Sequence, residues 1–219
     1  MKHMNPLSIL AWVVIFFIVL AFIAYSQGKR RGEAFQKFAR QRGLSYAKKG
    51  DVNAVSAFSE YHLFAANTEK TVSNMIFGEP GSVSVSLFDY RFRTAASRSA
   101  SGKSQTVAMG KSRRLTFPAF ELYPQGTFHT MLSIPGKQDI NFQHQKGFSE
   151  RYILRSDDEG AVRSIFTDQV LSFFESHRGL TVIAQGDTLV YYRDGKLIKP
   201  GTLNSFLSDL LEMFRLFEK

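Results

Sequence analysis

The residues that could do chemistry are sparse and widely spaced in this sequence. The five histidines are His3, His62, His129, His144 and His177, so the closest pair is 15 residues apart and no pair has zinc-ligand spacing. There is no cysteine, which excludes thiolate metal sites, a cysteine nucleophile and a disulfide framework. Phosphate-binding glycine loops, H-E-x-x-H and G-x-S-x-G are missing as well. We therefore expect no cofactor and no resident metal.

The strongest acidic cluster is Asp157, Asp158 and Glu159. Carboxylates at such a position complement the N-terminal dipole of a following helix and cap its free N–H groups. A Mg²⁺ or Ca²⁺ site needs further oxygen ligands at set intervals, and this cluster has no such pattern. Catalysis therefore stays the alternative hypothesis, with a site assembled from dispersed polar residues.

A basic patch is the most interesting candidate for binding. Between residues 90 and 120 there are seven Lys or Arg and no acid, namely Arg91, Arg93, Arg98, Lys103, Lys111, Arg113 and Arg114. Such charge near a membrane can bind anionic lipid headgroups or another membrane-associated protein, and the competing interpretation is a solvated strand face and loop. On a strand, Arg91 and Arg93 share one face, opposite Tyr90 and Phe92.

The whole-chain charge points elsewhere at first. The 219 residues carry a net charge of +9, with a pI of about 9.8, which by itself suggests nucleic acid. Residues 1–50 hold +8 of this charge and the remaining residues hold +1. Base-stacking aromatics are not interleaved with the loop cations of the basic patch. No nucleic-acid partner is expected.

The first 50 residues contain an uncharged apolar run that explains where the charge lies. Residues 7–25 form 19 consecutive positions without charge, Gly or Pro, and a helix of that length spans about 28 Å, close to the hydrocarbon thickness of a bilayer. A cleaved signal peptide has a shorter apolar core, and the basic triplet 29–31 that follows resists export. The run predicts a transmembrane helix, with the lipid bilayer as its partner.

Orientation follows from the cations on either side of this helix. Lys2 alone precedes it, whereas six cations follow it, namely Lys29, Arg30, Arg31, Lys37, Arg40 and Arg42. The more basic flank stays in the cytoplasm. We predict a short extracytoplasmic N-terminus (1–6), a transmembrane helix (7–25), a basic juxtamembrane helix (26–44) and a cytoplasmic domain (45–219).

The domain shows strand patterns without regular alternation with helices. The predicted strands are 71–77, 83–92, 105–109, 119–123, 139–142, 151–155, 180–184 and 188–192. Residues 94–104 are small and polar, which predicts a loop. One helix is expected from the acidic cluster to about residue 178, and a last helix carries an apolar stripe from Leu203 to Phe217. This order predicts an α+β fold with a largely antiparallel sheet packed with helices.

Several segments resemble a family of uncharacterised bacterial single-pass membrane proteins. These segments are RGLSY (42–46), VSLFDY (85–90), FELYP (120–124), DINF (139–142) and FSERYILR (148–155), followed by Asp157 and Asp158. The resemblance implies a bacterial origin, an N-terminal membrane helix, a basic helix and an α+β domain with an F-D-Y strand. It implies no reaction and no functional residues.

These observations favour a single-pass protein of the bacterial inner or plasma membrane. Its cytoplasmic domain is expected to bind another protein or the membrane surface and to lack catalytic chemistry. The alternative hypothesis is an enzyme, and a nucleic-acid binder is the least favoured class.

Overall fold

The computed structural model describes residues 6–58, 61, 64, 67–94, 102–126 and 139–218. One long helix, α1 (Pro6–Gln41), precedes the sheet and its helices. The strands are β1 (Ser45–Lys49), β2 (Asn67–Gly78), β3 (Ser84–Thr94), β4 (Lys103–Lys111), β5 (Phe117–Pro124), β6 (Tyr152–Ser156), β7 (Thr181–Gly186) and β8 (Thr188–Tyr192). The shorter helices are η1 (Val52–Phe58), α3 (Lys146–Ser149), α4 (Glu159–Ile165), α5 (Asp168–Ser176), η3 (Pro200–Thr202) and α6 (Leu203–Phe217).

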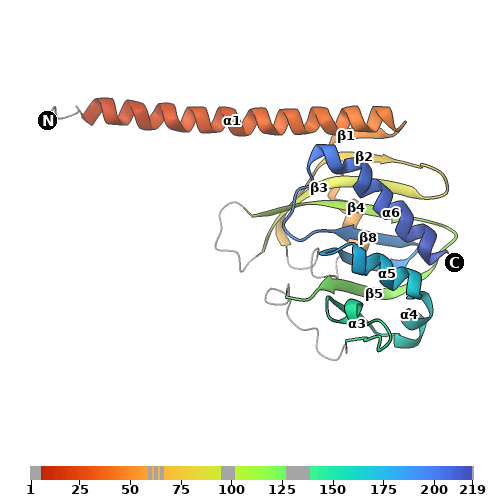
Figure 1. Cartoon of the computed structure of the whole chain (residues 1–219). Coiled ribbons are helices and arrows are strands. Elements are labelled where there is room, and N and C mark those ends of the chain that lie inside the picture. The colour runs from red at the N-terminus through yellow and green to blue at the C-terminus, as the bar shows by residue number, and fades with distance from the viewer. Residues whose placement is uncertain are drawn as a thin grey trace.

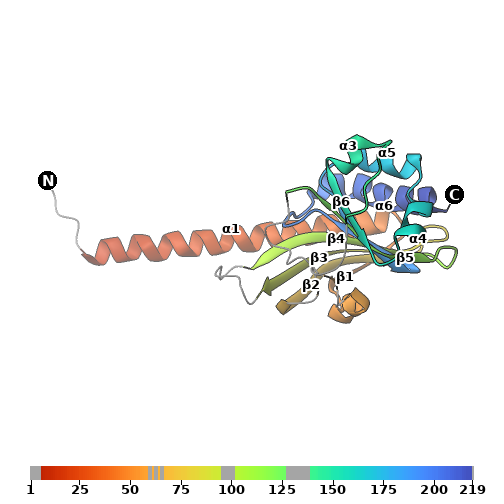
Figure 2. The same ribbon diagram turned by 90° about the horizontal axis from the view of Figure 1, so that it is seen from below.

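The eight strands form one sheet in the order β1-β2-β3-β4-β8-β7-β5-β6, and every pairing between these strands is antiparallel. The helices α3, α4, α5 and α6 gather on one side of it (Figures 1 and 2). The predicted α+β class is therefore confirmed.

Both faces of the central strands are largely buried, which explains the strands with apolar residues on both sides. One face packs against α1 and α3–α6 in a large core that includes Phe35, Leu87 and Phe214. The other face packs against η1 in a smaller core that includes Phe58 and Tyr90. Alternate residues of β3 serve the two cores, as the period of a strand requires.

Helix α1 is continuous from its apolar half into the domain. Its N-terminal part projects away from the sheet, and its C-terminal part lies along it (Figure 1). Of the described residues, one helical stretch, Trp12–Gln41, is long and apolar enough to cross a membrane. The large apolar side chains from Trp12 to Tyr25 are exposed, whereas Phe35 and Ala39 are fully buried in the large core. Residues 26–41 thus pack into the fold as well as carrying charge.

Helix α6 crosses the sheet with the apolar stripe expected from the sequence. Along the stripe the side chains are buried, with Leu211 partly exposed. Its approach to β4 depends on Gly110, because a Cβ at that position would lie 2.3 Å from Cε2 of Phe214. Phe214 cannot easily retreat, since its ring is buried and sits edge-on to Phe117 at 5.8 Å.

Two expectations from the sequence differ from the structure. The helix predicted to run from the acidic cluster to residue 178 is two helices, α4 and α5. Thr167, with an extended backbone, and Asp168 in the next turn supply a second helix start, and the break lets Phe166 bury its ring against Phe120. The predicted strand 139–142 is a single bridge between Asp139 and Arg155.

Gly110→Ala tests the approach of α6 to β4. The added methyl group overlaps a ring that has no room to move, so the substitution should lower the free energy of unfolding by about 1–3 kcal/mol. Thermal or denaturant unfolding of the full-length protein in detergent measures it. Gly28→Ala is the matched control, because nothing lies within 4 Å of that position and alanine favours a helix. Equal stability of the Gly110→Ala variant and the parent protein would contradict the packing.

Candidate functional site

Arg31 lies on the side of α1 that meets the sheet, and its guanidinium is largely buried. The Arg31 side chain is 17% exposed and that of Asp89, on β3, is 10% exposed. Arg31 Nε and Nη2 donate to the two carboxylate oxygens of Asp89 at 2.7 Å each, which makes a bidentate ion pair. Nη1 donates to the carbonyl oxygen of Ile198 at 2.6 Å. One side chain thus joins the helix, the central sheet and the segment before α6.

Three further side chains complete this cluster. Thr106 Oγ1 accepts from Arg31 Nη2 at 3.0 Å and donates to Asp89 Oδ1 at 2.8 Å. Asn74 Nδ2 donates to Asp89 Oδ2 at 2.9 Å, and Asn74 Oδ1 accepts from the Tyr46 hydroxyl at 3.1 Å. We call Arg31, Asp89, Thr106, Asn74 and Tyr46 the clamp. Every polar group that it buries on Asp89 has a partner, as a buried charge requires.

The local backbone is adapted to the clamp. Asn74 has a φ of 50°, a conformation that Asn tolerates better than most residues, and the register of β2 against β3 shifts between Ser73 and Ile76. Gly32 lets α1 come close, since a Cβ there would lie 3.1 Å from the Tyr46 hydroxyl. Burial raises the pKa of Tyr46 and the Asp89 carboxylate adds to the shift, so the hydroxyl stays protonated and able to donate.

From the sequence alone, Arg31 is predicted only as a topology-setting cation and Asp89 has no predicted role. A signal for Asp89 was present, because it follows Val85 and Leu87 on the same face of β3 and a lone acid on an apolar face needs a partner. The other topology-setting cations lie at the surface. Lys29 and Glu33 form an exposed pair at 3.9 Å, Arg42 donates to Asn204, and Arg30, Lys37 and Arg40 are exposed.

The predicted basic patch is split between the two ends of the sheet. Arg91, Arg93 and Lys103 lie where β3 ends and β4 begins, on the side toward the apolar half of α1 (Figure 2). Lys111, Arg113 and Arg114 lie at or beyond the other end of β4. Lys103 and Lys111 are eight residues apart along β4, which separates the two groups by about 26 Å. Arg98 lies outside the described residues. Two surfaces replace the single patch suggested by the sequence.

The expected division of faces on β3 is confirmed. Tyr90 and Phe92 are buried in the smaller core and stack at 5.4 Å, whereas Arg91 is exposed on the opposite face. Arg91 and Arg93 line a shallow polar hollow of about 290 Å³ together with Glu69 and Thr71. Arg93 Nη1 lies 3.0 Å from Glu69 Oε1 and Lys103 Nζ lies 3.8 Å from Asp194 Oδ2, both in exposed pairs.

A second titratable cluster joins α5 to α6. His177 Nε2 lies 3.8 Å from Asp209 Oδ1, and Ser176 Oγ lies 3.0 Å from His177 Nδ1. The arrangement contains the residue types of a catalytic triad, but its hydrogen bonds do not activate the serine. Ser176 Oγ donates to the Phe173 carbonyl at 2.8 Å, and His177 Nδ1 lies 2.9 Å from the same oxygen, so that nitrogen carries the proton. Stacking of His177 on Phe173 fixes the imidazole.

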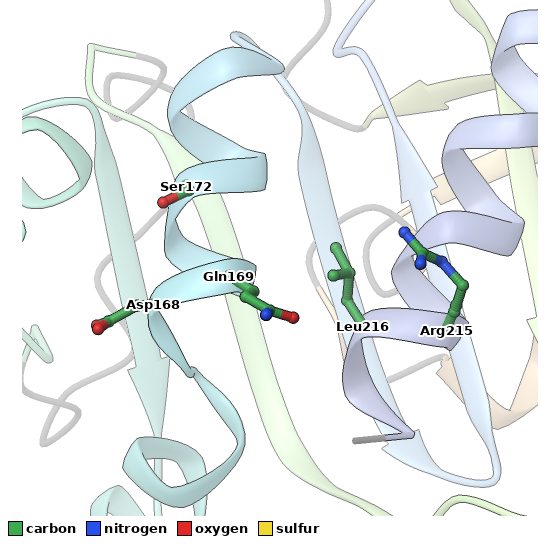
Figure 3. Close-up of a pocket in the computed structure, with 5 residues that line it drawn as sticks. All are labelled: Asp168, Gln169, Ser172, Arg215 and Leu216. Atoms are coloured by element: carbon green, nitrogen blue, oxygen red, sulfur yellow. The ribbon is translucent and has the colours of Figure 1, made fainter.

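The surface hollows of the described part of the chain are shallow. One hollow, of about 490 Å³, lies between α5 and α6, and its lining includes Gln169, Ser172 and Arg215 (Figure 3). The side chains drawn there spread along two helices and do not converge on a point.

Within the described ranges, no three His, Asp or Glu side chains gather as metal ligands. The acidic cluster is explained locally, since Asp158 accepts from the Ala161 N–H at 2.9 Å as a helix cap.

Comparison with known proteins gives one structural similarity. No protein-family model matches the sequence, and no curated protein matches it. Among solved structures, the chain is similar to the crystal structure of the mycobacterial trehalose monomycolate transport factor A, TtfA, with a TM-score of 0.57 and 11% sequence identity. The similarity covers 86% of this chain and 92% of that chain. It shows a shared fold.

Arg31→Ala tests the clamp. Removing the guanidinium leaves the Asp89 carboxylate buried without its ionic partner, so the free energy of unfolding should fall by about 3–5 kcal/mol. Arg30→Ala, which changes the exposed neighbour, should stay within about 0.5 kcal/mol of the parent protein. Denaturant unfolding in detergent compares the two, and the double variant Arg31→Leu/Asp89→Leu should recover most of the loss. Equal effects of the two alanine variants would refute the clamp.

Asp209→Asn tests the cluster between α5 and α6. Burial raises the pKa of Asp209, although His177 and Arg193 oppose the shift. A carboxyl whose folded-state pKa lies above its unfolded value contributes most stability below that unfolded value and loses it as the pH rises through the folded one. The asparagine variant should therefore melt at a higher temperature than the parent protein at neutral pH, and this advantage should shrink toward pH 4.

Glu79→Gln is the control for this comparison, because Glu79 is exposed on the turn after β2. Its melting temperature should follow that of the parent protein across the same pH range. A lower melting temperature of Asp209→Asn at neutral pH would show that the contacts with His177 and Arg193 outweigh burial.

Proposed function

We propose that this protein is a single-pass membrane-anchored binding module without catalytic chemistry. Helix α1 crosses the inner or plasma membrane of a bacterial cell, its N-terminus lies outside, and the α+β domain lies in the cytoplasm. The domain binds another membrane-associated protein or the membrane surface itself. The observation that carries this proposal is the continuity of α1, whose exposed apolar half runs without a break into the helix held by the clamp.

The apolar half of α1 supports anchoring. Its large side chains from Trp12 to Tyr25 are exposed, and the described residues around them make no core there. A helix face this apolar is stable in lipid and costly in water. Lys29 and Arg30 follow it as exposed cations, which favours the cytoplasm for the domain.

The domain interior supports a binding role. Both faces of its sheet carry packed side chains, and the hollows of the described surface are open to solvent. Small-molecule sites and catalytic sites are concave and enclosed, with convergent polar groups. The triad-like residues Ser176, His177 and Asp209 lack an activated nucleophile. An enzyme would instead depend on one indispensable polar residue in a pocket.

The structural similarity is compatible with this role. The protein of shared fold is named as a factor in the transport of trehalose monomycolate. A factor that assists transport is a role that fits a domain anchored at a membrane and built for binding.

Cysteine labelling tests the anchor and its direction. Because the chain has no cysteine, single variants Asn5→Cys and Thr116→Cys each carry one reactive thiol. A membrane-impermeant maleimide should label the first variant in intact cells, and the second only after the cells are permeabilised, since Thr116 is exposed on the domain. Labelling of Thr116→Cys in intact cells would refute the cytoplasmic domain.

The matched control is Arg30→Ser/Arg40→Ser placed in both cysteine backgrounds. Both cations are exposed, and their removal leaves Lys29, Lys37 and Arg42 on the same flank, so the labelling sides should not change. Release of the protein from membranes by alkaline carbonate would contradict a spanning helix.

A further inference from the structure

The two ends of the sheet differ in charge. At the end toward the apolar half of α1, the described residues 69–70, 91–94, 102–104 and 193–196 hold six Lys or Arg and two acids, a net charge of +4. At the opposite end, residues 79–83, 111–116, 156–159 and 186–188 hold three Lys or Arg and five acids, a net charge of −2. The sheet therefore presents its basic end toward the membrane segment (Figures 1 and 2).

The clamp fixes the position of this basic end along the axis of α1. Arg31 on α1 is level with Asp89 on β3, and both views show the helix running alongside the strands. Along α1 toward its apolar half, Tyr25, the last residue of the apolar run, lies about 9 Å from Arg31 at 1.5 Å per residue of helix. Along β3 in the same direction, Arg93 lies about 13 Å and Arg91 about 7 Å from Asp89, at 3.3 Å per residue of strand. These cations therefore reach the level at which α1 enters lipid.

Arg93 and Lys103 can exchange their present carboxylate partners for a new anion. The pairs that Arg93 makes with Glu69 and Lys103 makes with Asp194 are exposed, with side chains 38% to 69% accessible. Exposed pairs of this kind contribute little to stability, so a phosphate group can exchange for the carboxylate. The hollow lined by Arg91 and Arg93 offers two guanidinium groups on one face, the geometry that binds phosphate oxygens.

We propose that Arg91, Arg93 and Lys103, the proximal triad, form a docking surface for the anionic phospholipid headgroups of the membrane in which α1 is anchored. This inference rests on the proposed function, because it requires α1 to span that membrane. The geometry favours lipid over a protein or nucleic-acid partner, since the clamp holds the triad at headgroup level wherever the chain is anchored. Lys111, Arg113 and Arg114, the distal triad, have the same charge at the end that faces away.

The test uses the full-length chain in lipid nanodiscs. A fluorophore on Ser104→Cys, opposite Arg91 in the β3–β4 pairing, reports contact with a fixed trace of phosphatidylcholine that carries a headgroup nitroxide quencher. Quenching should be stronger in discs that contain phosphatidylglycerol than in discs of phosphatidylcholine alone, and salt should remove the difference. Replacing the proximal triad with Gln should abolish the difference, because each lost cation weakens headgroup affinity about fivefold.

The distal triad provides the matched control. Its three Gln substitutions should leave the phosphatidylglycerol effect unchanged, and a fluorophore on Thr116→Cys should show no such effect. If the triple proximal variant fails to fold, Lys103→Gln alone carries the test, with an affinity about fivefold weaker. A phosphatidylglycerol effect that persists without the proximal triad, or that is absent from the parent protein, overturns the inference. Cysteine labelling in cells reports on the anchor separately, so the two failures are distinguishable.

Discussion

The ion pair between Arg31 and Asp89 is the contact on which the arrangement of the molecule depends. Two charges that are largely withdrawn from water are stable only when each supplies the other's partner. Asp89 lies on a central strand and Arg31 lies six residues after the apolar run, so their pairing fixes where along the helix the sheet is attached. Apolar packing of Phe35 and Ala39 would hold the helix but specify its position less sharply, because hydrophobic contact is not directional.

A fixed attachment ties the position of the domain to the apolar half of α1. A flexible linker would let the sheet take any orientation relative to the apolar half of α1. A continuous helix instead fixes both the distance of the sheet from that half and its rotation about the helix axis. The strands run alongside α1, so one end of the sheet lies toward the apolar half of α1 and the other lies away from it (Figure 1). Because the clamp and the apolar packing hold α1 along the strands, the difference in charge between these ends has a fixed direction relative to α1.

Regular elements were predictable from the sequence, and long-range pairings were not. The residue patterns gave the last helix and seven of the eight strands, since helix and strand periods are local properties, whereas β1 was not predicted. Asp89 found its partner 58 residues away, a contact that no local period encodes. The cations of the basic patch are close in sequence because β4 has only nine residues. An extended strand of nine residues nevertheless places the cations at its two ends far apart in space. Thr167 and Asp168 are helix-start residues whose signal was hidden within a longer apolar period.

The hollows between α5 and α6 and beside Arg91 are open to solvent because of how this fold uses its sheet. An antiparallel sheet often keeps one face in water, and a ligand cleft can form where that face is left open. Here η1 covers the face that α1 and α3–α6 leave free, and aromatic side chains such as Phe58 and Tyr90 fill the space between. What remains for recognition is the rim of the sheet, where strands end and charged residues collect. A partner can bind these strand ends only if it contacts them at a defined position along α1. The clamp fixes that position relative to the apolar half of α1.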